Sequence, residues 1–334
     1  MELIITVTFA FITIKLFKSV AIVLGLVDKP GERKKNARHI LLIVGAIFAG
    51  VLAASLFWLT NTPELRIYLV AAAMMVFIGA LDDKFVLKVR IRIVGQIVIA
   101  SLMIYGIGVY ILHLGDLFSF GDFELGPIVI ILTYFATILV INAFNMVDVI
   151  DGLIGNLSLN TFTAIAILFL ISGNKGYLSY PLILATATLT YLIFNLGFFK
   201  NYSKKIFMGD AGIMFIGLSV IWLLTIGTQG ESASFRPVTA LWICAIPLMV
   251  MLAIVMRRYR EGKSPFKQVR DHLRHMLQRA CLTSRQTLVV ISISSVIMSL
   301  SVVLGEYFQV PESIELALFV LMLILYNKSA RHFS

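Results

Sequence analysis

Apolar segments, each close to the length needed to cross a lipid bilayer, recur along nearly the whole chain. A transmembrane helix needs about 20 such residues. Mean hydropathy is +0.95, and only 14% of the residues are charged, values outside the range of soluble domains. We therefore predict an all-α, polytopic integral membrane protein of about eleven transmembrane helices, forming one domain over residues 1–334. The expected spans are 2–18, 40–60, 67–81, 93–113, 127–144, 153–172, 178–197, 211–228, 237–256, 286–305 and 313–327.

Positive charge is distributed very unevenly between the two sets of alternating connections. The loops 25–39, 82–92, 145–152, 198–210 and 257–285, with the C-terminal tail, hold 23 of the 28 Lys and Arg residues. The alternate loops hold only Arg66, Lys175 and Arg236. The positive-inside rule places the basic loops in the cytoplasm, with the N-terminus periplasmic and the C-terminus cytoplasmic. Because the net charge of +10 lies in these loops rather than on one solvated face, nucleic acid is not an expected partner.

A run of polar residues, Asn142–Gly152 (NAFNMVDVIDG), directly follows an apolar segment. Its polar side chains Asn142, Asn145, Asp148 and Asp151 recur every three residues. Carboxylates beside membrane-depth helices are costly and indicate function. On a helix, Asp148 and Asp151 share one face, and Asn142 approaches Asp151 only if the helix ends or unwinds near Gly152. We predict a helix end that opens on a cavity; a merely capped terminus is the alternative.

Two further acidic islands lie in similar settings, at Leu81–Asp83 and Met208–Gly212. Adjacent carboxylates stay ionised beside a cation or a hydrogen-bond donor, and Mg²⁺ typically uses one or two carboxylates together with substrate phosphates. One acid of the Asp82–Asp83 pair is alternatively a general base. Asp210 precedes a predicted helix whose N-terminus favours anions, although an N-cap role is also open. All the islands fall on the cytoplasmic side, which favours one metal and phosphate site.

Basic residues follow the Asp82–Asp83 pair and also fill the first cytoplasmic loop. Lys84 and three further cations suit the charge of a phosphate: Lys88, Arg90 and Arg92. In loop 25–39, three cations are expected to neutralise a pyrophosphate, with Asp28 orienting them: Lys29, Arg33 and Lys34. A plain positive-inside loop is the alternative interpretation.

The last cytoplasmic loop, 257–285, contains the sequence RDHLRH. Arg270, His272, Arg274 and His275 are expected to contact phosphate or ribose. Paired histidines also suit zinc, but no third ligand lies nearby in the sequence. An amphipathic basic helix on anionic lipid is the remaining alternative.

Seven sequence motifs together resemble the polyprenyl-phosphate N-acetylhexosamine-1-phosphate transferase family, and above all its branch that transfers N-acetylglucosamine 1-phosphate to undecaprenyl phosphate. The resemblance covers nearly the whole chain in order. The motifs are GLVDKP at 25–30, LDD at 81–83, NAFNMVD at 142–148, IDGL at 150–153, FMGDAG at 207–212, FRPVTALW at 235–242 and SPF at 264–266.

This resemblance implies a multi-pass enzyme of the bacterial inner membrane that uses Mg²⁺ or Mn²⁺. It implies UDP-GlcNAc as donor, undecaprenyl phosphate as acceptor and UMP as product, in the first membrane step of O-antigen or enterobacterial common antigen synthesis. It implies catalytic roles for Asp82, Asp83, Asp148 and Asp151 and metal binding by Asp83 and Asp210. The expected substrate-binding residues are Asp28, Lys29, Arg33, Lys84, Asn142, Asn145, Asn195, Arg270, His272, Arg274 and His275.

The chain departs from the family pattern near the expected site. Arg274 replaces a histidine, Val149 a glycine and Ile213 a serine, while Val86, Val250 and Val269 replace aspartates. One alternative is therefore the same chemistry with another UDP-sugar, such as UDP-MurNAc-pentapeptide or another UDP-HexNAc. Another is a weakly active or degenerate paralogue that acts as a non-catalytic membrane protein. A transporter or scaffold is a rival from another class, but its charges would lie near the bilayer midplane. The sequence leaves a monomer and a homodimer both open.

Overall fold

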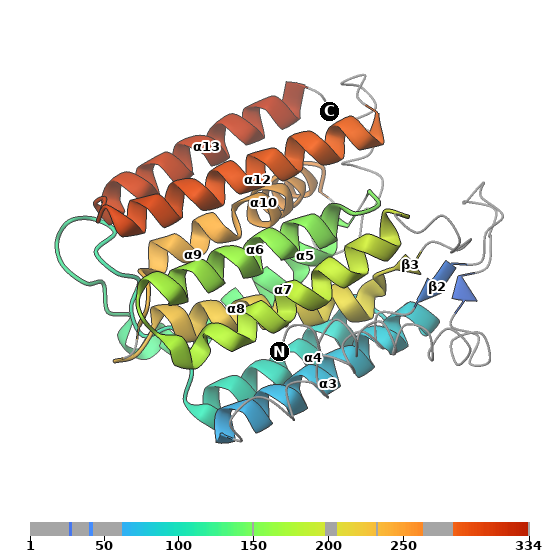
Figure 1. Cartoon of the computed structure of the whole chain (residues 1–334), viewed down its shortest axis with the longest axis horizontal. Coiled ribbons are helices and arrows are strands. Elements are labelled where there is room, and N and C mark those ends of the chain that lie inside the picture. The colour runs from blue at the N-terminus through green and yellow to red at the C-terminus, as the bar shows by residue number, and fades with distance from the viewer. Residues whose placement is uncertain are drawn as a thin grey trace.

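The computed structural model describes residues 27–28, 40–42, 62–148, 150–197, 206–231, 233–262 and 283–332. Over these residues the protein is a bundle of long helices that run side by side (Figure 1). The helices are α3 (Pro63–Phe85), α4 (Val89–Ser101), α5 (Val129–Val147), α6 (Leu153–Ile171), α7 (Lys175–Asn195), α8 (Gly209–Thr228), α9 (Pro237–Ile243), α10 (Ala245–Arg260), α12 (Ser284–Tyr307) and α13 (Glu312–His332). A π-helical turn, Leu102–Gly106, extends α4, and a 3-10 turn, Gly126–Ile128, precedes α5.

Seven helical segments in the described part are long and apolar enough to cross a membrane, and the bent pair α9–α10 makes an eighth if it is one span. This confirms a helical, multi-pass membrane protein. α13 coincides with the last expected span. The expected span at 2–18 lies outside the described residues. So does the expected span at 40–60, apart from its first three residues. The total of eleven and the side of each terminus stay predictions.

A small three-stranded sheet stands at one end of the bundle, and the sequence analysis missed it. β1 (Val27–Asp28) pairs antiparallel with β2 (Ile40–Leu42), which pairs parallel with β3 (Ile206–Phe207). The first residues of the expected span 40–60 are thus a strand rather than a helix. Strands of two or three residues are too short to show an alternating pattern. One residue, Met208, joins β3 to α8, and we call this end of the bundle the sheet end.

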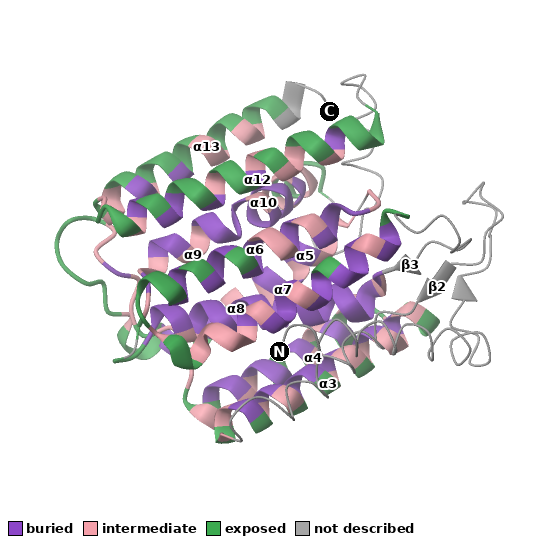
Figure 2. Ribbon diagram, viewed as in Figure 1, coloured by how far each residue is buried: buried purple, intermediate pink, exposed green. Residues whose placement is uncertain are grey.

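Helix α8 lies in the interior and is buried along nearly its whole length (Figure 2). Two glycines let its neighbours approach closely. A Cβ on Gly79 of α3 would lie 2.3 Å from Ala211 Cα, and a Cβ on Gly217 of α8 would lie 2.6 Å from Ile141 Cα in α5. Small residues at contacts allow membrane helices to pack backbone against backbone. α8 is therefore fixed between α3 and α5.

The opposite end of the bundle, where α8 finishes at Thr228, is held by one arginine. Arg236, at the start of α9, donates hydrogen bonds to the carboxylates of Glu306 and Glu315, each at 3.2 Å. It also donates to the backbone carbonyl oxygens of Gly305 and Val310. These contacts tie α9 to the hairpin between α12 and α13.

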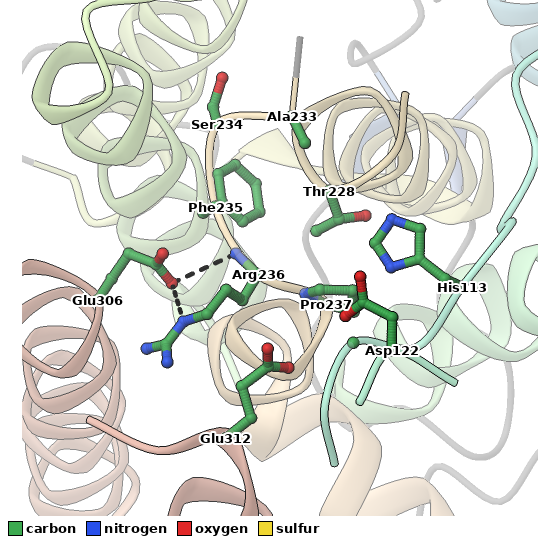
Figure 3. Close-up of a pocket in the computed structure, with 11 residues that line it drawn as sticks. His113, Asp122, Thr228, Ala233, Ser234, Phe235, Arg236, Pro237, Glu306 and Glu312 are labelled. Atoms are coloured by element: carbon green, nitrogen blue, oxygen red, sulfur yellow. Dashed lines mark hydrogen bonds and ion pairs between the residues drawn. The ribbon is translucent and has the colours of Figure 1, made fainter. Parts of the chain in front are cut away.

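A cavity of about 250 Å³ opens beside this arginine. His113 and Asp122 from the segment between α4 and α5 line it, together with Glu306 and Glu312 from the α12–α13 hairpin (Figure 3). We call this end the pocket end.

Two expected spans have different boundaries in the structure. The segment expected at 93–113 is helical from Val89 to Gly106, and Gly108 then adopts a left-handed φ of 67°. The segment expected at 237–256 bends by 75° between α9 and α10. Pro247 accounts for this bend. Its ring clashes with the backbone carbonyl of Ile243, four residues earlier, and its nitrogen carries no hydrogen to donate to that carbonyl.

Candidate active site at the sheet end

Asp83 brings the end of α3 onto the start of α8. Its carboxylate oxygens accept hydrogen bonds from the backbone amides of Asp210 at 2.8 Å and Ala211 at 3.2 Å. The first amides of a helix have no partner within the helix and attract anions. Gly79 lies one turn before Asp83 and allows the close approach. The expected meeting of the Asp82–Asp83 and Asp210 islands is therefore confirmed.

Asp82, the neighbour of Asp83, faces elsewhere. It is 4% exposed. One carboxylate oxygen accepts from the Leu87 amide at 2.7 Å and the other from the guanidinium of Arg92 at 2.8 Å. Arg92 was expected to serve phosphate, but it is itself buried in this ion pair. Asp82 thus closes the corner between α3 and α4. The expected loop 82–92 is only a short turn, because α3 continues to Phe85 and α4 begins at Val89.

The Asn142–Gly152 segment contains a helix end, as predicted. The helix runs three residues past the expected span 127–144 but stops before Gly152, near which it was expected to end or unwind. α5 stops at Val147, and α6 begins after Gly152, whose φ is 80°. Asp148 and Asp151 therefore lie in the connection between two helices, so the expectation that they share one helix face is wrong. Asn142 remains inside α5, where its side chain donates to Gln96 Oε1 of α4 at 2.9 Å.

Tyr191 of α7 links this connection to the start of α8. Its buried hydroxyl accepts a hydrogen bond from the Met208 backbone amide, and the charges of Asp148 and Asp151 act on the same hydroxyl. Met208 immediately precedes α8. All three acidic islands therefore gather at the sheet end. Both Gly209 and Asp210 belong to α8, which shortens the expected loop 198–210 at its C-terminal side.

The carboxylates of this region suit a hard divalent cation in chemical type. Carboxylate oxygen is the ligand that Mg²⁺ and Mn²⁺ prefer. Within the described residues, no three His, Cys, Asp or Glu side chains are arranged to hold a metal. Mg²⁺ needs only one or two carboxylates when substrate phosphates complete its shell, so Asp83 and Asp210 fit such a partial site.

The remaining residues expected to bind substrate are spread more widely. Lys84 is exposed, with its ammonium 5.3 Å from the centre of the Phe85 ring. Asn145 lies in α5, and Asn195 is the buried last residue of α7. Asp28 lies in β1, and only its backbone is described. The others lie outside the described residues: Lys29, Arg33, Arg270, His272, Arg274 and His275.

Three departures from the family pattern fall in the described part. Val86 ends α3 in a left-handed conformation, with φ of 51°, and is 83% exposed. Val250 packs in one buried apolar cluster with Val147 and Leu153. Val147 is the residue immediately before Asp148. Ile213 is buried in α8. Each position that would carry an aspartate or serine in the family pattern is therefore apolar here. Val149 and Val269 lie outside the described residues.

The fold and this end of the bundle define a multi-pass membrane protein with carboxylates gathered around the start of one enclosed helix. Sequence comparison identifies its family. Residues 65–228 match "Glycosyl transferase family 4". The chain is 45% identical to the undecaprenyl-phosphate alpha-N-acetylglucosaminyl 1-phosphate transferase of Salmonella typhi, over 98% of this chain and 89% of that protein.

This chain is also 42% identical to the protein of the same name from Yersinia pestis and 41% identical to the one from Haemophilus influenzae. These alignments cover 98% and 97% of this chain and 90% and 91% of those proteins. The chain therefore belongs to glycosyl transferase family 4, among the polyprenyl-phosphate sugar-phosphate transferases, and it is an enzyme.

Proposed function

We propose that this enzyme transfers N-acetylglucosamine 1-phosphate from UDP-GlcNAc to undecaprenyl phosphate. The acceptor phosphate oxygen attacks the β-phosphorus of the donor, the bond from that phosphorus to the oxygen bridging to the α-phosphorus breaks, and UMP leaves. The product is undecaprenyl-diphospho-GlcNAc. The main support is the near full-length similarity to transferases whose name gives this acceptor and sugar.

The acidic cluster at the sheet end supports the same proposal on physical grounds. Asp83 and Asp210 come together at a helix N-terminus, and Asp82 also acts electrostatically on Asp83. Like charges placed this closely favour a positive counter-charge. When bound there by Asp83 and Asp210, Mg²⁺ or Mn²⁺ would neutralise charge on the donor pyrophosphate.

The residues of the chain itself mainly bind and orient the two substrates. The acceptor phosphate is already largely ionised at neutral pH, so holding its oxygen in line with the β-phosphorus contributes more than removing a proton. Asp148 and Asp151, beside Tyr191, belong to the same catalytic end. The basic residues of loops 25–39 and 257–285 bind the donor phosphates and ribose. The guanidinium of Arg274 binds a phosphate through two of its N–H groups.

The proposed setting is the bacterial inner membrane, with this site facing the cytoplasm where UDP-sugars are made. The concentration of Lys and Arg in loops 25–39, 82–92, 198–210 and 257–285 of the sequence supports this orientation. The product would open O-antigen or enterobacterial common antigen synthesis.

Membranes that contain the protein test the donor directly. Radiolabelled UDP-GlcNAc or UDP-MurNAc-pentapeptide is supplied with undecaprenyl phosphate, and the organic phase is examined for labelled lipid. We expect label from UDP-GlcNAc alone, and its loss when EDTA is added. Label from the pentapeptide donor would change the substrate, and no label from either donor would refute the transferase activity proposed here.

A further inference from the structure

The two adjacent carboxylates at the end of α3 have different surroundings. Asp82 is enclosed by protein, and its partner Arg92 is only 5% exposed. One carboxylate oxygen of Asp82 accepts from the Leu87 amide at 2.7 Å, and the other accepts from the Arg92 guanidinium at 2.8 Å. The backbone carbonyl of Asp82 also accepts from the Val86 amide at 2.8 Å. Every one of these contacts fixes the turn that leads into α4.

Asp83 points to another neighbour because successive side chains on a helix differ by about 100° in direction. Its carboxylate reaches across to α8, and its contacts are backbone amides rather than a cation. Asp82 therefore connects α3 to α4, whereas Asp83 connects α3 to the start of α8.

We propose that Asp82 and Arg92 are positioning residues. Their ion pair holds the last turn of α3 at the rotation that directs Asp83 onto the amides of Asp210 and Ala211. The inference rests on the proposed function where it concerns transfer, and it divides the two acids: Asp83 faces the reacting groups, whereas Asp82 acts through Asp83.

A direct role for Asp82 in the reaction requires it to leave its present partners. A metal or a substrate phosphate would have to displace the Arg92 guanidinium, leaving a buried cation without a counter-charge. Breaking a buried ion pair from one side is strongly destabilising, whereas replacing both partners together is often nearly neutral. This asymmetry gives the proposal a quantitative test.

The test compares Asp82→Asn, Arg92→Gln and the double variant with the parent enzyme, each purified in detergent as folded protein. The first measurement is hydrogen exchange at the amides of Asp210 and Ala211, which needs no substrate. We expect each single variant to speed this exchange by about tenfold or more, and the double variant to return to within about threefold of the parent, since local opening sets exchange.

The second measurement is the steady-state transfer rate per folded enzyme with UDP-GlcNAc. In the single variants we expect kcat to fall about 100-fold with little change in donor KM, and in the double variant to recover at least about tenfold. The matched control is Asp83→Asn combined with Arg92→Gln, where no recovery is expected. If only the double variant folds, that rescue supports the pairing, and Arg92→Lys then replaces Arg92→Gln as the measurable single variant.

Three results would overturn the proposal. Exchange that stays at the parent rate in both single variants would show that the pair does not hold Asp83 in place. A double variant as inactive as Asp82→Asn, with normal exchange, would make Asp82 a participant in the reaction. Unchanged kcat per folded enzyme would leave the pair purely structural. A parent enzyme without transfer would refute the proposed function instead, and the exchange result would still decide the positioning.

Discussion

The two ends of α8 both gather acidic side chains, but they neutralise them differently. At the pocket end, Glu306 and Glu315 are bound by the guanidinium of Arg236. At the sheet end, Asp83 is held by backbone amides while Asp210 and Asp82 act on it with the same sign of charge. A carboxylate already paired with a fixed cation has a structural role, whereas neighbouring carboxylates favour a positive ligand. The comparison separates the supporting end from the reactive one.

The largest expected difference between the ends comes from removing one negative charge at each. Asp210→Asn keeps the shape of the side chain but removes the charge that a hard cation requires, so transfer should fall by at least about 1,000-fold. Asp122→Asn at the pocket end is the matched control and should keep nearly full activity. Labelled lipid per folded enzyme is the measurement. Turnover of Asp210→Asn within a fewfold of the parent would remove Asp210 from the site.

The pocket end should instead respond in stability. Arg236→Gln leaves Glu306 and Glu315 without their cation, so the free energy of unfolding should drop by about 3 kcal/mol. Activity per folded enzyme should stay close to that of the parent. Arg66→Gln, at an exposed position in α3, is the control and should change stability by less than about 0.5 kcal/mol. Thermal unfolding in detergent checks both variants, and equal melting temperatures would contradict the supporting role of the pocket end.

The contact that places Asp83 should tolerate little change. An added methyl group in Gly79→Ala meets the backbone of Ala211 at 2.3 Å, and α3 must move away from α8. Transfer should then decline on the order of tenfold to a hundredfold, because Asp83 leaves its position.

Gly95→Ala is the control for this change. The atoms nearest to its added Cβ all belong to the Ile78 side chain, with Cδ1 at 2.5 Å, and the end of that flexible side chain can turn aside. Assays at matched amounts of folded protein compare the two variants. Equal activities would show that the α3–α8 contact does not control the reactive end.

The smallest expected effect is a gain in stability beside the site. Val86 has a left-handed backbone, which is unfavourable for a β-branched residue. Val86→Gly should therefore raise the free energy of unfolding by about 1 kcal/mol. The same change at Val94, exposed within α4, should lower it by about 0.5 kcal/mol. Chemical unfolding of the two variants measures the opposite signs, and a loss of stability in Val86→Gly would contradict this interpretation.

The helical membrane class followed from the sequence because apolar segments of membrane length are a local property. Boundaries did not follow where a single residue decided them, as at Pro247 and Gly108. The sheet was missed because β2 pairs with β3 across more than 160 residues of sequence, a contact that no local pattern records. The roles of the individual site residues stay predictions.

Within the site, the acidic islands were recognised because carboxylates next to apolar segments are rare and costly. Their mutual arrangement was only partly foreseen. Asp148 and Asp151 were placed on a helix that in fact ends at Val147. The partners Arg92, Gln96 and Tyr191 carry no motif that distinguishes them from other residues of their helices. Their contacts depend on which helices are neighbours, and helix periodicity alone does not determine that.

The two glycine contacts of α8 also limit where the chain can change in length. Ala211 meets Gly79 and Gly217 meets Ile141, six residues apart, so α3 and α5 contact sides of α8 that differ by about 120°. Inserting or deleting one residue between Ala211 and Gly217 would turn one contact by about 100° relative to the other, and both could not form. Among homologous chains, we therefore expect gaps in an alignment to fall before Met208 or after Gly217, and the six-residue interval to keep its length even where its side chains differ.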